Sequence, residues 1–276
     1  MTSSFPVRTD TYLDRILEQT FKDLVVRKAL IGVDALREKA ALQPDPVDFE
    51  AALTQDTVTV IAEFKRASPS KGIFPVSIAP AEIATEYIAG GASGISCLTD
   101  EPFFKGSLAD LEVISEAGFA ASPQIGVLRK DFIIDRFQID EARAFGASCI
   151  LLITAALDDA TLADLFRHAV DMGLSVLVEI HDEDEGKRAV ASGATLIGIN
   201  NRDLRSFKVD LRISERLAPM LPGACTVVGE SGISSNEDVV RLAKAGVHAV
   251  LVGESLILQD DRIAATRALT GVPRGS

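Results

Sequence analysis

Hydrophobic residues gather into eight short runs along the chain, and segments of helical pattern separate most of these runs. The runs are rich in Val and Ile and do not alternate strictly with polar residues, which is typical of strands covered on their outer face by helices. The runs occupy residues 57–64, 91–98, 124–130, 146–153, 174–180, 193–200, 225–231 and 246–253.

Four of the runs share a repeated beginning, a glycine followed by an aliphatic residue four positions later. These glycines are Gly91, Gly146, Gly193 and Gly246, and their spacing is too long for one strand–helix unit but suits two. An unmarked strand is therefore expected between each pair, and an apolar run is found there every time. The intervening helical segments often begin at Ser or Asp and nearly all end at Gly, as capped helices do. They cover residues 79–91, 107–118, 135–146, 159–173, 183–193, 212–223 and 235–246.

This alternation of strands and helices predicts an α/β protein with a parallel sheet. A closed (β/α)8 TIM barrel is the simplest such architecture, and an open doubly wound sheet is the alternative, although a GxGxxG turn after the first strand is missing. Residues 11–42 have the apolar spacing of one or two amphipathic helices, followed by a turn at 43–49. We therefore expect a single domain, with a helical extension over residues 1–48 packed on a barrel over residues 49–272.

Polar residues close five of the predicted strands, in phase with the residues expected to face inward. Alternate residues of a strand share a face, so Glu63 and Lys65 lie on the side of Ile61, while the opposite side is apolar and should meet the helices. The carboxyl ends of barrel strands meet at the mouth, where (β/α)8 enzymes keep their sites, and neighbouring acids and bases there suit proton transfer. The other inward ends are Lys130, Glu179, Asn200 with Arg202 two residues further on, and Glu230.

Two glycine turns predict a phosphate site beside these charges. The seventh strand ends in "GESGIS" and the eighth in "LVGESL", which places Gly232 and Gly253 just before expected helix starts. Backbone N–H groups at such turns can bind an anion, and many barrels hold phosphate after their last two strands.

Composition narrows the classes of partner and compartment. The net charge of −12 argues against nucleic acid, and no stretch of about 18 apolar residues suggests a membrane span. The first ten residues have no apolar core of a secretory signal, and Cys97, Cys149 and Cys225 sit in or beside apolar runs as core thiols of a reducing compartment would. We therefore expect a cytoplasmic protein. His181 follows a strand end directly, where a surface or capping role is favoured over a site role.

The residues alone leave three functions open. The first is acid–base catalysis on a phosphorylated substrate. The second is a sugar-phosphate isomerase or class I aldolase in which Lys130 forms a Schiff base. The third is a barrel that binds a phosphorylated ligand without turnover, which five in-phase polar strand ends argue against.

Six motifs together resemble the indole-3-glycerol phosphate synthase family. They are "IAEFKRASPSKG", "RKDFIIDRFQI", "LVEIHDEDE", "IGINNRDL", "VVGESGI" and "LVGESL", in matching order over about residues 10 to 270. The resemblance implies a barrel with a helical segment over its mouth and a lyase (carboxy-lyase) of tryptophan biosynthesis. It closes the ring of 1-(2-carboxyphenylamino)-1-deoxyribulose 5-phosphate, releases CO2 and water, and yields indole-3-glycerol phosphate. It implies no metal and no organic cofactor. Other enzymes of the tryptophan pathway are candidate partners.

The resemblance also implies roles for the residues at the strand ends. Lys130 resembles the general acid that protonates the carbonyl oxygen, and Glu63 and Glu179 resemble carboxylates that shape the site and assist dehydration. Lys65 resembles the cation that pairs with the substrate carboxylate and with neighbouring acids. Asn200 and Ser231 resemble groups that hold sugar hydroxyls and site water, and Ser68, Arg202 and Glu230 match supporting positions.

The phosphate cradle implied by the family consists of Gly232, Gly253 and the residue after it. That residue is Glu254, where a hydroxyl residue is often found, so its side chain is expected to turn away and leave its backbone N–H to the phosphate. Ser255 is a candidate to help instead. An apolar floor for the aromatic ring is also needed, and the candidates are Leu98, Phe132, Pro69 and Leu151.

Overall fold

The computed structural model describes residues 7–75 and 79–275. Most of the N-terminal stretch that we inspected for a secretory signal, residues 1–6, lies outside this range. Within the described residues, no helix combines the length and the apolar character needed to cross a membrane.

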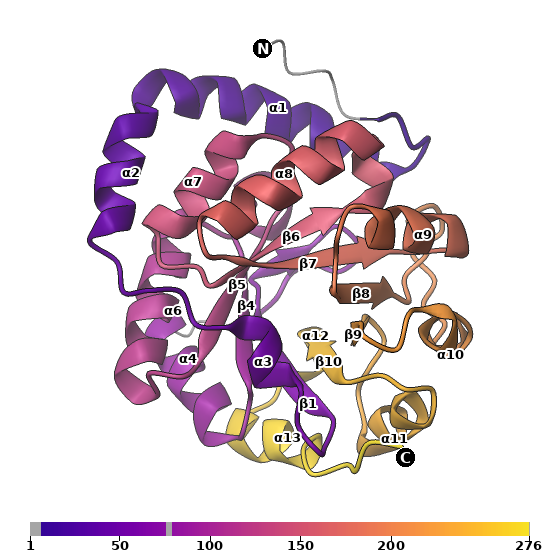
Figure 1. Cartoon of the computed structure of the whole chain (residues 1–276). Helices are drawn as coiled ribbons and strands as arrows, with labels where there is room; N and C mark the ends of the chain where they lie inside the picture. The colour runs from indigo at the N-terminus through magenta and orange to yellow at the C-terminus, as the bar shows by residue number, and fades with distance from the viewer. Residues whose placement is uncertain (1–6, 76–78, 276) are drawn as a thin grey trace.

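Eight parallel strands close into a barrel, which confirms the predicted (β/α)8 fold and rejects the open sheet. Going around the barrel, the order is β1, β10, β9, β8, β7, β6, β5 and β4, and β4 pairs with β1 to close the ring. Figure 1 shows the helices packed around these strands. The strands are β1 (Thr59–Phe64), β4 (Gly94–Leu98), β5 (Gly126–Lys130), β6 (Cys149–Ile153), β7 (Ser175–Ile180), β8 (Leu196–Asn200), β9 (Thr226–Glu230) and β10 (Ala249–Val252).

All seven predicted helical segments between the strands contain an α-helix. These are α4 (Pro80–Ala89), α6 (Leu108–Ala121), α7 (Arg136–Ala144), α8 (Asp159–Asp171), α9 (Glu183–Ala191), α10 (Arg212–Leu217) and α11 (Asn236–Lys244). Short elements that carry too few turns to show a period were not predicted. They are α3 (Phe49–Leu53), α5 (Glu101–Phe104), α12 (Glu254–Ile257), α13 (Arg262–Ala268) and the 3₁₀ turns η1 (Thr154–Ala156) and η2 (Ala218–Met220).

The repeated glycines have a common conformational cause. Gly91, Gly146, Gly193 and Gly246 follow helix ends, and all four have left-handed backbone, with φ between +83° and +99°. A residue with a Cβ is disfavoured in this region, so glycine ends the helix and turns the chain into the next strand. The repeat therefore marks helix-to-strand turns at the bottom of the barrel.

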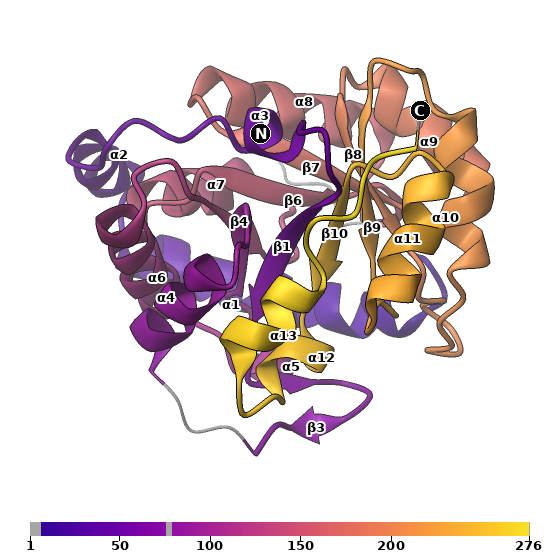
Figure 2. The ribbon, with the colours of Figure 1, turned by 90° about the horizontal axis from the view of Figure 1, so that it is seen from below.

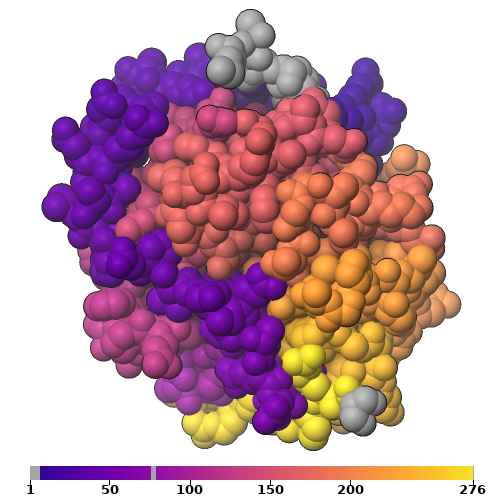
Figure 3. Space-filling model, in the orientation of Figure 1, coloured from indigo at the N-terminus to yellow at the C-terminus, as the bar shows by residue number. Residues whose placement is uncertain are grey.

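The N-terminal segment covers both ends of the barrel. Helix α1 (Tyr12–Leu30) places Tyr12, Leu13 and Ile16 against the cavity at the mouth, and α2 (Val33–Ala41) packs beside α7. At the opposite end Phe49 of α3 is fully buried against the start of β4 and β5, where a Cβ on Gly94 or Gly126 would lie under 3 Å from its ring. Figure 3 shows this segment, in indigo and purple, along one side of the molecule.

The segment after β1, which includes "SPSKG", contains secondary structure that the sequence pattern did not predict. It forms an antiparallel hairpin of β2 (Ala67–Ser68) and β3 (Gly72–Ile73), in which Ala67 pairs with Ile73. Figure 2 shows the β3 strand projecting from the body of the barrel, near α12. A two-residue strand is too short for alternation to reveal, and the hairpin turn is made possible by Gly72 at φ +72°.

Candidate active site

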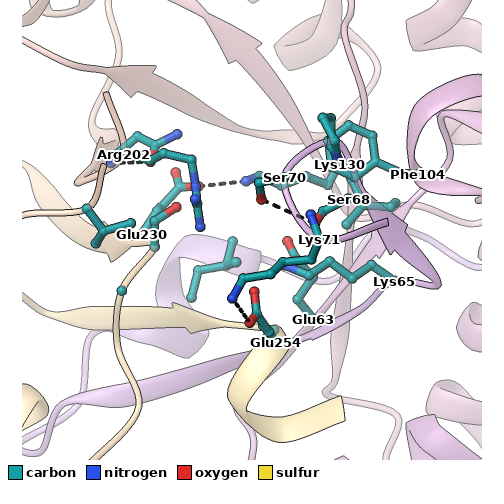
Figure 4. A pocket seen from close by; sticks show the side chains of 18 of the residues that line it. Glu63, Lys65, Ser68, Ser70, Lys71, Phe104, Lys130, Arg202, Glu230 and Glu254 are labelled. Carbon is teal, nitrogen blue, oxygen red and sulfur yellow. Dashed lines mark hydrogen bonds and ion pairs between the residues drawn. The ribbon is translucent and has the colours of Figure 1, made fainter. Parts of the chain in front are cut away.

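A single cavity of about 670 Å³ at the barrel mouth brings all the predicted site residues together. Its wall contains every polar strand end named above, and the four apolar floor candidates also line it. Figure 4 shows the labelled side chains converging from separate strands and from the hairpin. The predicted members are Glu63, Lys65, Ser68, Lys130, Glu179, Asn200, Arg202, Glu230, Ser231, Gly232, Gly253, Glu254 and Ser255.

Glu63 and Lys65 form a close ion pair at the end of β1. Lys65 Nζ donates to Glu63 Oε1 at 2.7 Å, and both side chains are largely buried. Burial alone would raise the pKa of Glu63, but the positive charges of Lys65 and Lys130 outweigh it and lower that pKa. A Cβ at position 253 would overlap the Glu63 carboxylate and come within 2.9 Å of Lys65 Nζ, so a glycine is required beside this pair.

Lys130 lies at the centre of the charge cluster. Its Nζ is 2.7 Å from Glu230 Oε2 and 3.8 Å from Glu179 Oε2, and its side chain is 14% exposed. Burial would lower the pKa of Lys130, but the surrounding carboxylates of Glu230, Glu179 and Glu63 raise it above its ordinary value. The amine is therefore held as an ammonium ion.

At Glu230 the effects that raise the pKa outweigh the one that lowers it. Burial raises its pKa to about 7, and the negative charges of Glu179 and Glu63 add to this, against the lowering effect of Lys130. Its second oxygen, Oε1, is buried without a hydrogen-bond partner in the described structure. That oxygen occupies the space over Gly198, where any Cβ would overlap it. A group that shares a proton near neutral pH and has an unused oxygen is suited to acid–base work.

The strand-end residues on β8 and β9 have specific local geometry. Asn200 Oδ1 accepts from the Arg202 backbone N–H at 3.0 Å, and Arg202 Nη1 donates to the Phe207 carbonyl at 3.1 Å. Ser231 has φ +65°, which is unusual for a residue with a Cβ and marks a strained turn at the end of β9. This turn lets Ser231 and Gly232 both line the cavity.

The expected phosphate region carries a cation that the sequence analysis did not single out. Gly232 has φ +82°, and a Cβ there would overlap Val209, so only glycine fits. Glu254 lines the rim, and its Oε1 is 3.6 Å from the Nζ of Lys71 on the hairpin turn, as the dashed line in Figure 4 marks. The hydroxyl of Ser255 donates to the Ile233 carbonyl at 2.9 Å and so ties the β9 and β10 loops together.

Two polar clusters lie next to the cavity, one that strand alternation did not predict and one around a histidine for which a site role was not favoured. Arg129 is fully buried behind β5, where the pattern predicts an apolar residue, and its guanidinium donates to Asp131 and Glu141. His181 stands behind Glu179, with Nε2 3.4 Å from Glu179 Oε1. The available sequence signals were the RKD motif for Arg129 and the position directly after a strand for His181.

Comparison with known proteins places the chain among enzymes of one family. A sequence profile described as indole-3-glycerol phosphate synthase matches residues 13–269. The indole-3-glycerol phosphate synthase of Streptomyces griseus subsp. griseus is 48% identical, over 93% of this chain and 94% of that protein. The one from Roseiflexus sp. is 46% identical, over 95% and 99%.

Solved structures extend the likeness in fold. Thiamine phosphate pyrophosphorylase from Pyrococcus furiosus superposes with a TM-score of 0.59 over 80% of this chain and 96% of that one, at 16% identity. At this identity the comparison concerns the barrel architecture alone.

Proposed function

This chain belongs to the indole-3-glycerol phosphate synthase family, and from that premise we propose how the residues at the barrel mouth divide the reaction between them. The activity is that of the family. The enzyme, a carboxy-lyase of tryptophan biosynthesis, converts 1-(2-carboxyphenylamino)-1-deoxyribulose 5-phosphate into indole-3-glycerol phosphate. The reaction closes a ring, releases CO2 and then releases water.

Lys130 is the general acid for ring closure. Attack of the aromatic ring on the ketone develops negative charge on the carbonyl oxygen, and a positioned ammonium ion both neutralises that charge and donates a proton. The observation that carries this assignment is the Lys130 ammonium within reach of Glu230 and Glu179, at 2.7 Å and 3.8 Å, inside the cavity. The same surroundings oppose the Schiff-base alternative, because an amine must be neutral to attack a carbonyl.

The carboxylates of Glu179, Glu63 and Glu230 have roles that complement that of Lys130. Glu179 donates a proton to the departing hydroxyl in the dehydration step, and Glu63 shapes the site while it holds Lys65. In the described structure Lys65 pairs with Glu63, and in the complex its ammonium pairs with the substrate carboxylate as well. Glu230 holds Lys130, and its partner-free oxygen Oε1 is available to a substrate hydroxyl or a water molecule.

The phosphate end of the substrate lies against the β9 and β10 loops. Gly232, Gly253 and the Glu254 backbone form the cradle, with Arg202 and Lys71 as nearby cations. Glu254 is paired with Lys71 at 3.6 Å, so the phosphate competes with Glu254 for Lys71 when it binds. Ser255 holds the loop through Ile233, while Asn200, Ser231 and Ser68 provide polar contacts to the sugar.

Apolar residues of the cavity wall orient the aromatic ring. Leu98, Phe132 and Leu151 line the cavity from β4, from the segment after β5 and from β6, and Pro69 lines it from the hairpin. Phe132 in turn packs against Phe104 in a tilted arrangement, with ring centroids 6.0 Å apart. Contact of the aromatic ring with these side chains fixes which part of the substrate meets Lys130.

The proposed compartment, domain organisation and partners follow from the composition of the chain and from the tryptophan pathway. We place the protein in the cytoplasm, supported by its net charge of −12 and by three cysteines that are buried and unpaired. The described residues up to 48 act as the helical extension of a single domain whose barrel covers 49–272. The same net charge argues against nucleic acid as a partner, the lack of a stretch of about 18 apolar residues argues against a membrane span, and other tryptophan-pathway enzymes are the candidates for association.

A turnover assay that follows the indole fluorescence of the product tests the assignment of Lys130. Lys130→Met should lower kcat by about 10²- to 10⁴-fold, the usual contribution of a positioned proton donor, and Glu179→Gln should lower it through the dehydration step. Lys187→Met, which removes an ammonium that is 73% exposed and far from the cavity wall, is the matched control and should leave kcat unchanged. Turnover by Lys130→Met at the wild-type rate would sink the assignment.

A further inference from the structure

His181 occupies a position directly behind Glu179 and outside the wall of the cavity. Its Nε2 is 3.4 Å from Glu179 Oε1, on the carboxylate oxygen opposite the one that faces Lys130. Its Nδ1 is 3.1 Å from Glu185 Oε2. The imidazole thus stands between a carboxylate of the cavity and a carboxylate of helix α9.

The local sequence explains this arrangement. His181 directly follows Ile180, the last residue of β7, and so lies beside Glu179 at the carboxyl end of that strand. Asp182 then caps α9, and Glu185 in the first turn of that helix accepts the His181 backbone N–H at 2.7 Å as well as the ring. These two contacts hold the Glu185 carboxylate in place, and the carboxylate in turn sets the orientation of the imidazole.

The hydrogen-bonding capacity of the ring depends on its proton. When both nitrogens are protonated, Nδ1–H donates to Glu185 Oε2, and the second proton is on Nε2, which lies 3.4 Å from Glu179 Oε1, within ion-pair distance. When the ring is neutral with Nδ1–H held by Glu185, Nε2 offers only a lone pair, and it can bond to Glu179 only if Glu179 has the proton. Glu179 and His181 therefore share one proton in either state, and that proton can pass from Nε2 to Oε1.

We propose that His181 is a positioning residue that supplies and holds the proton with which Glu179 releases water in the dehydration step. One proton moves from His181 Nε2 to the Glu179 carboxylate, and the carboxyl group so formed gives a proton to the departing hydroxyl as the C–O bond breaks and water leaves, which ends with a Glu179 carboxylate and a neutral His181 ring. The proton that the ring system loses as it becomes an indole balances the one consumed. This inference rests on the proposed role of Glu179.

The charges around the ring favour the protonated state. Burial would lower the pKa of His181, but Glu185, Glu179 and Glu230, from α9, β7 and β9, together raise it. A capping role alone would require only the contact with Glu185. Such a role does not explain why the second nitrogen, Nε2, is buried next to a carboxylate of the cavity. In the described structure Nε2 has no hydrogen bond.

A double-mutant cycle in the product-fluorescence assay distinguishes a His181 that supplies a proton to Glu179 from one that only contacts Glu185. His181→Gln keeps a donor amide but cannot transfer a proton, so we expect kcat to fall at least about tenfold with KM changed less than about twofold. The alkaline limb of the kcat–pH profile should change in the same variant. Because His181 acts only through Glu179, adding His181→Gln to Glu179→Gln should cause no further loss. Wild-type kcat in His181→Gln, or additive losses in the double variant, would overturn the proposal.

A matched control is available in His168, whose Nε2 is 3.2 Å from Asp140 Oδ1 and whose side chain is 17% exposed, close to the 15% of His181. His168→Gln should leave kcat and the pH profile unchanged. If His181→Gln does not fold, NMR titration of His181 in the wild type and in Glu179→Gln tests the proposal instead. A proton shared with Glu179 requires the pKa of His181 to fall in Glu179→Gln. An unchanged pKa of His181 would refute the sharing. Full activity of Glu179→Gln would instead refute the proposed role of Glu179 itself.

Discussion

Replacing Arg129 with methionine tests whether a buried charge network supports the strand that carries Lys130. The Arg129 guanidinium is fully buried and donates to Asp131 Oδ2 at 2.8 Å, to Glu141 Oε2 at 3.3 Å and to the Gln138 carbonyl at 2.6 Å. Burial would lower the pKa of Arg129, but these carboxylates raise it, and Arg129 in turn lowers the pKa of Asp131 against the effect of burial. Methionine keeps much of the volume and removes the charge.

The expected cost follows from what remains after the substitution. Glu141 keeps Arg27, whose Nε is 3.0 Å away, and Asp131 keeps the Thr99 hydroxyl at 2.6 Å, but both carboxylates stay in the interior with less positive charge around them. Breaking a buried ion pair from one side costs about 3–5 kcal/mol. At about 2–4 °C per kcal/mol for a domain of this size, the thermal midpoint should fall by about 6–20 °C.

Thermal denaturation followed by circular dichroism measures this loss at neutral pH. The deficit of Arg129→Met should shrink towards acid pH, because protonation of the stranded carboxylates removes the unpaired charge. Turnover should fall too, since Lys130 is the next residue on β5 and small displacements of a catalytic group are costly. Arg212→Met, which breaks an exposed pair with Asp210, should leave the midpoint unchanged. A midpoint within about 2 °C of the wild type for Arg129→Met, or a deficit independent of pH, would refute the reasoning.

Three further outcomes are expected. Gly198→Ala places a Cβ on the Glu230 carboxylate, so kcat should fall more than about tenfold while the fold loses only about 1–3 kcal/mol, and an unchanged kcat would contradict the contact. Folded Glu230 keeps its proton up to about pH 7 although its ordinary pKa is 4.5, so stability should decline as pH rises between these values, and less so in Glu230→Gln when thermal midpoints are compared. Lys71→Ala should raise KM roughly tenfold, the loss of one charge-assisted hydrogen bond of about 1.5 kcal/mol, with little change in kcat; an unchanged KM would show that Lys71 stays with Glu254.

Much of the site was predictable because strand alternation is a local rule. The period of two decides which face of a strand a residue occupies, and barrel closure then brings the carboxyl ends together. Glu63, Lys130 and Glu179 were identified in this way, and the structure places them in one cavity. Their chemical roles came from the family resemblance and stay proposals for the turnover assays.

Other features could not be read from the pattern. The extension was expected to pack on the barrel, and the family resemblance placed it over the mouth, but nothing in the residues identified Tyr12 as part of the cavity wall. Tyr12 reaches it because its ring packs edge-on against Phe103 and Phe207, which lie far away in the sequence. The hairpin after β1 was also missed, because its strands have two residues each and show no period.

The sequence by itself determined the order of strands and helices, the turns at the repeated glycines and the face on which each strand end lies, since each depends on neighbouring residues. The tertiary structure alone decided which charges pair. Lys130 with Glu230 and Lys71 with Glu254 join residues on different elements, and their distances are set by barrel closure and by side-chain packing. Electrostatic coupling falls off with distance and grows with burial, so the protonation states that the chemistry uses are properties of the folded barrel.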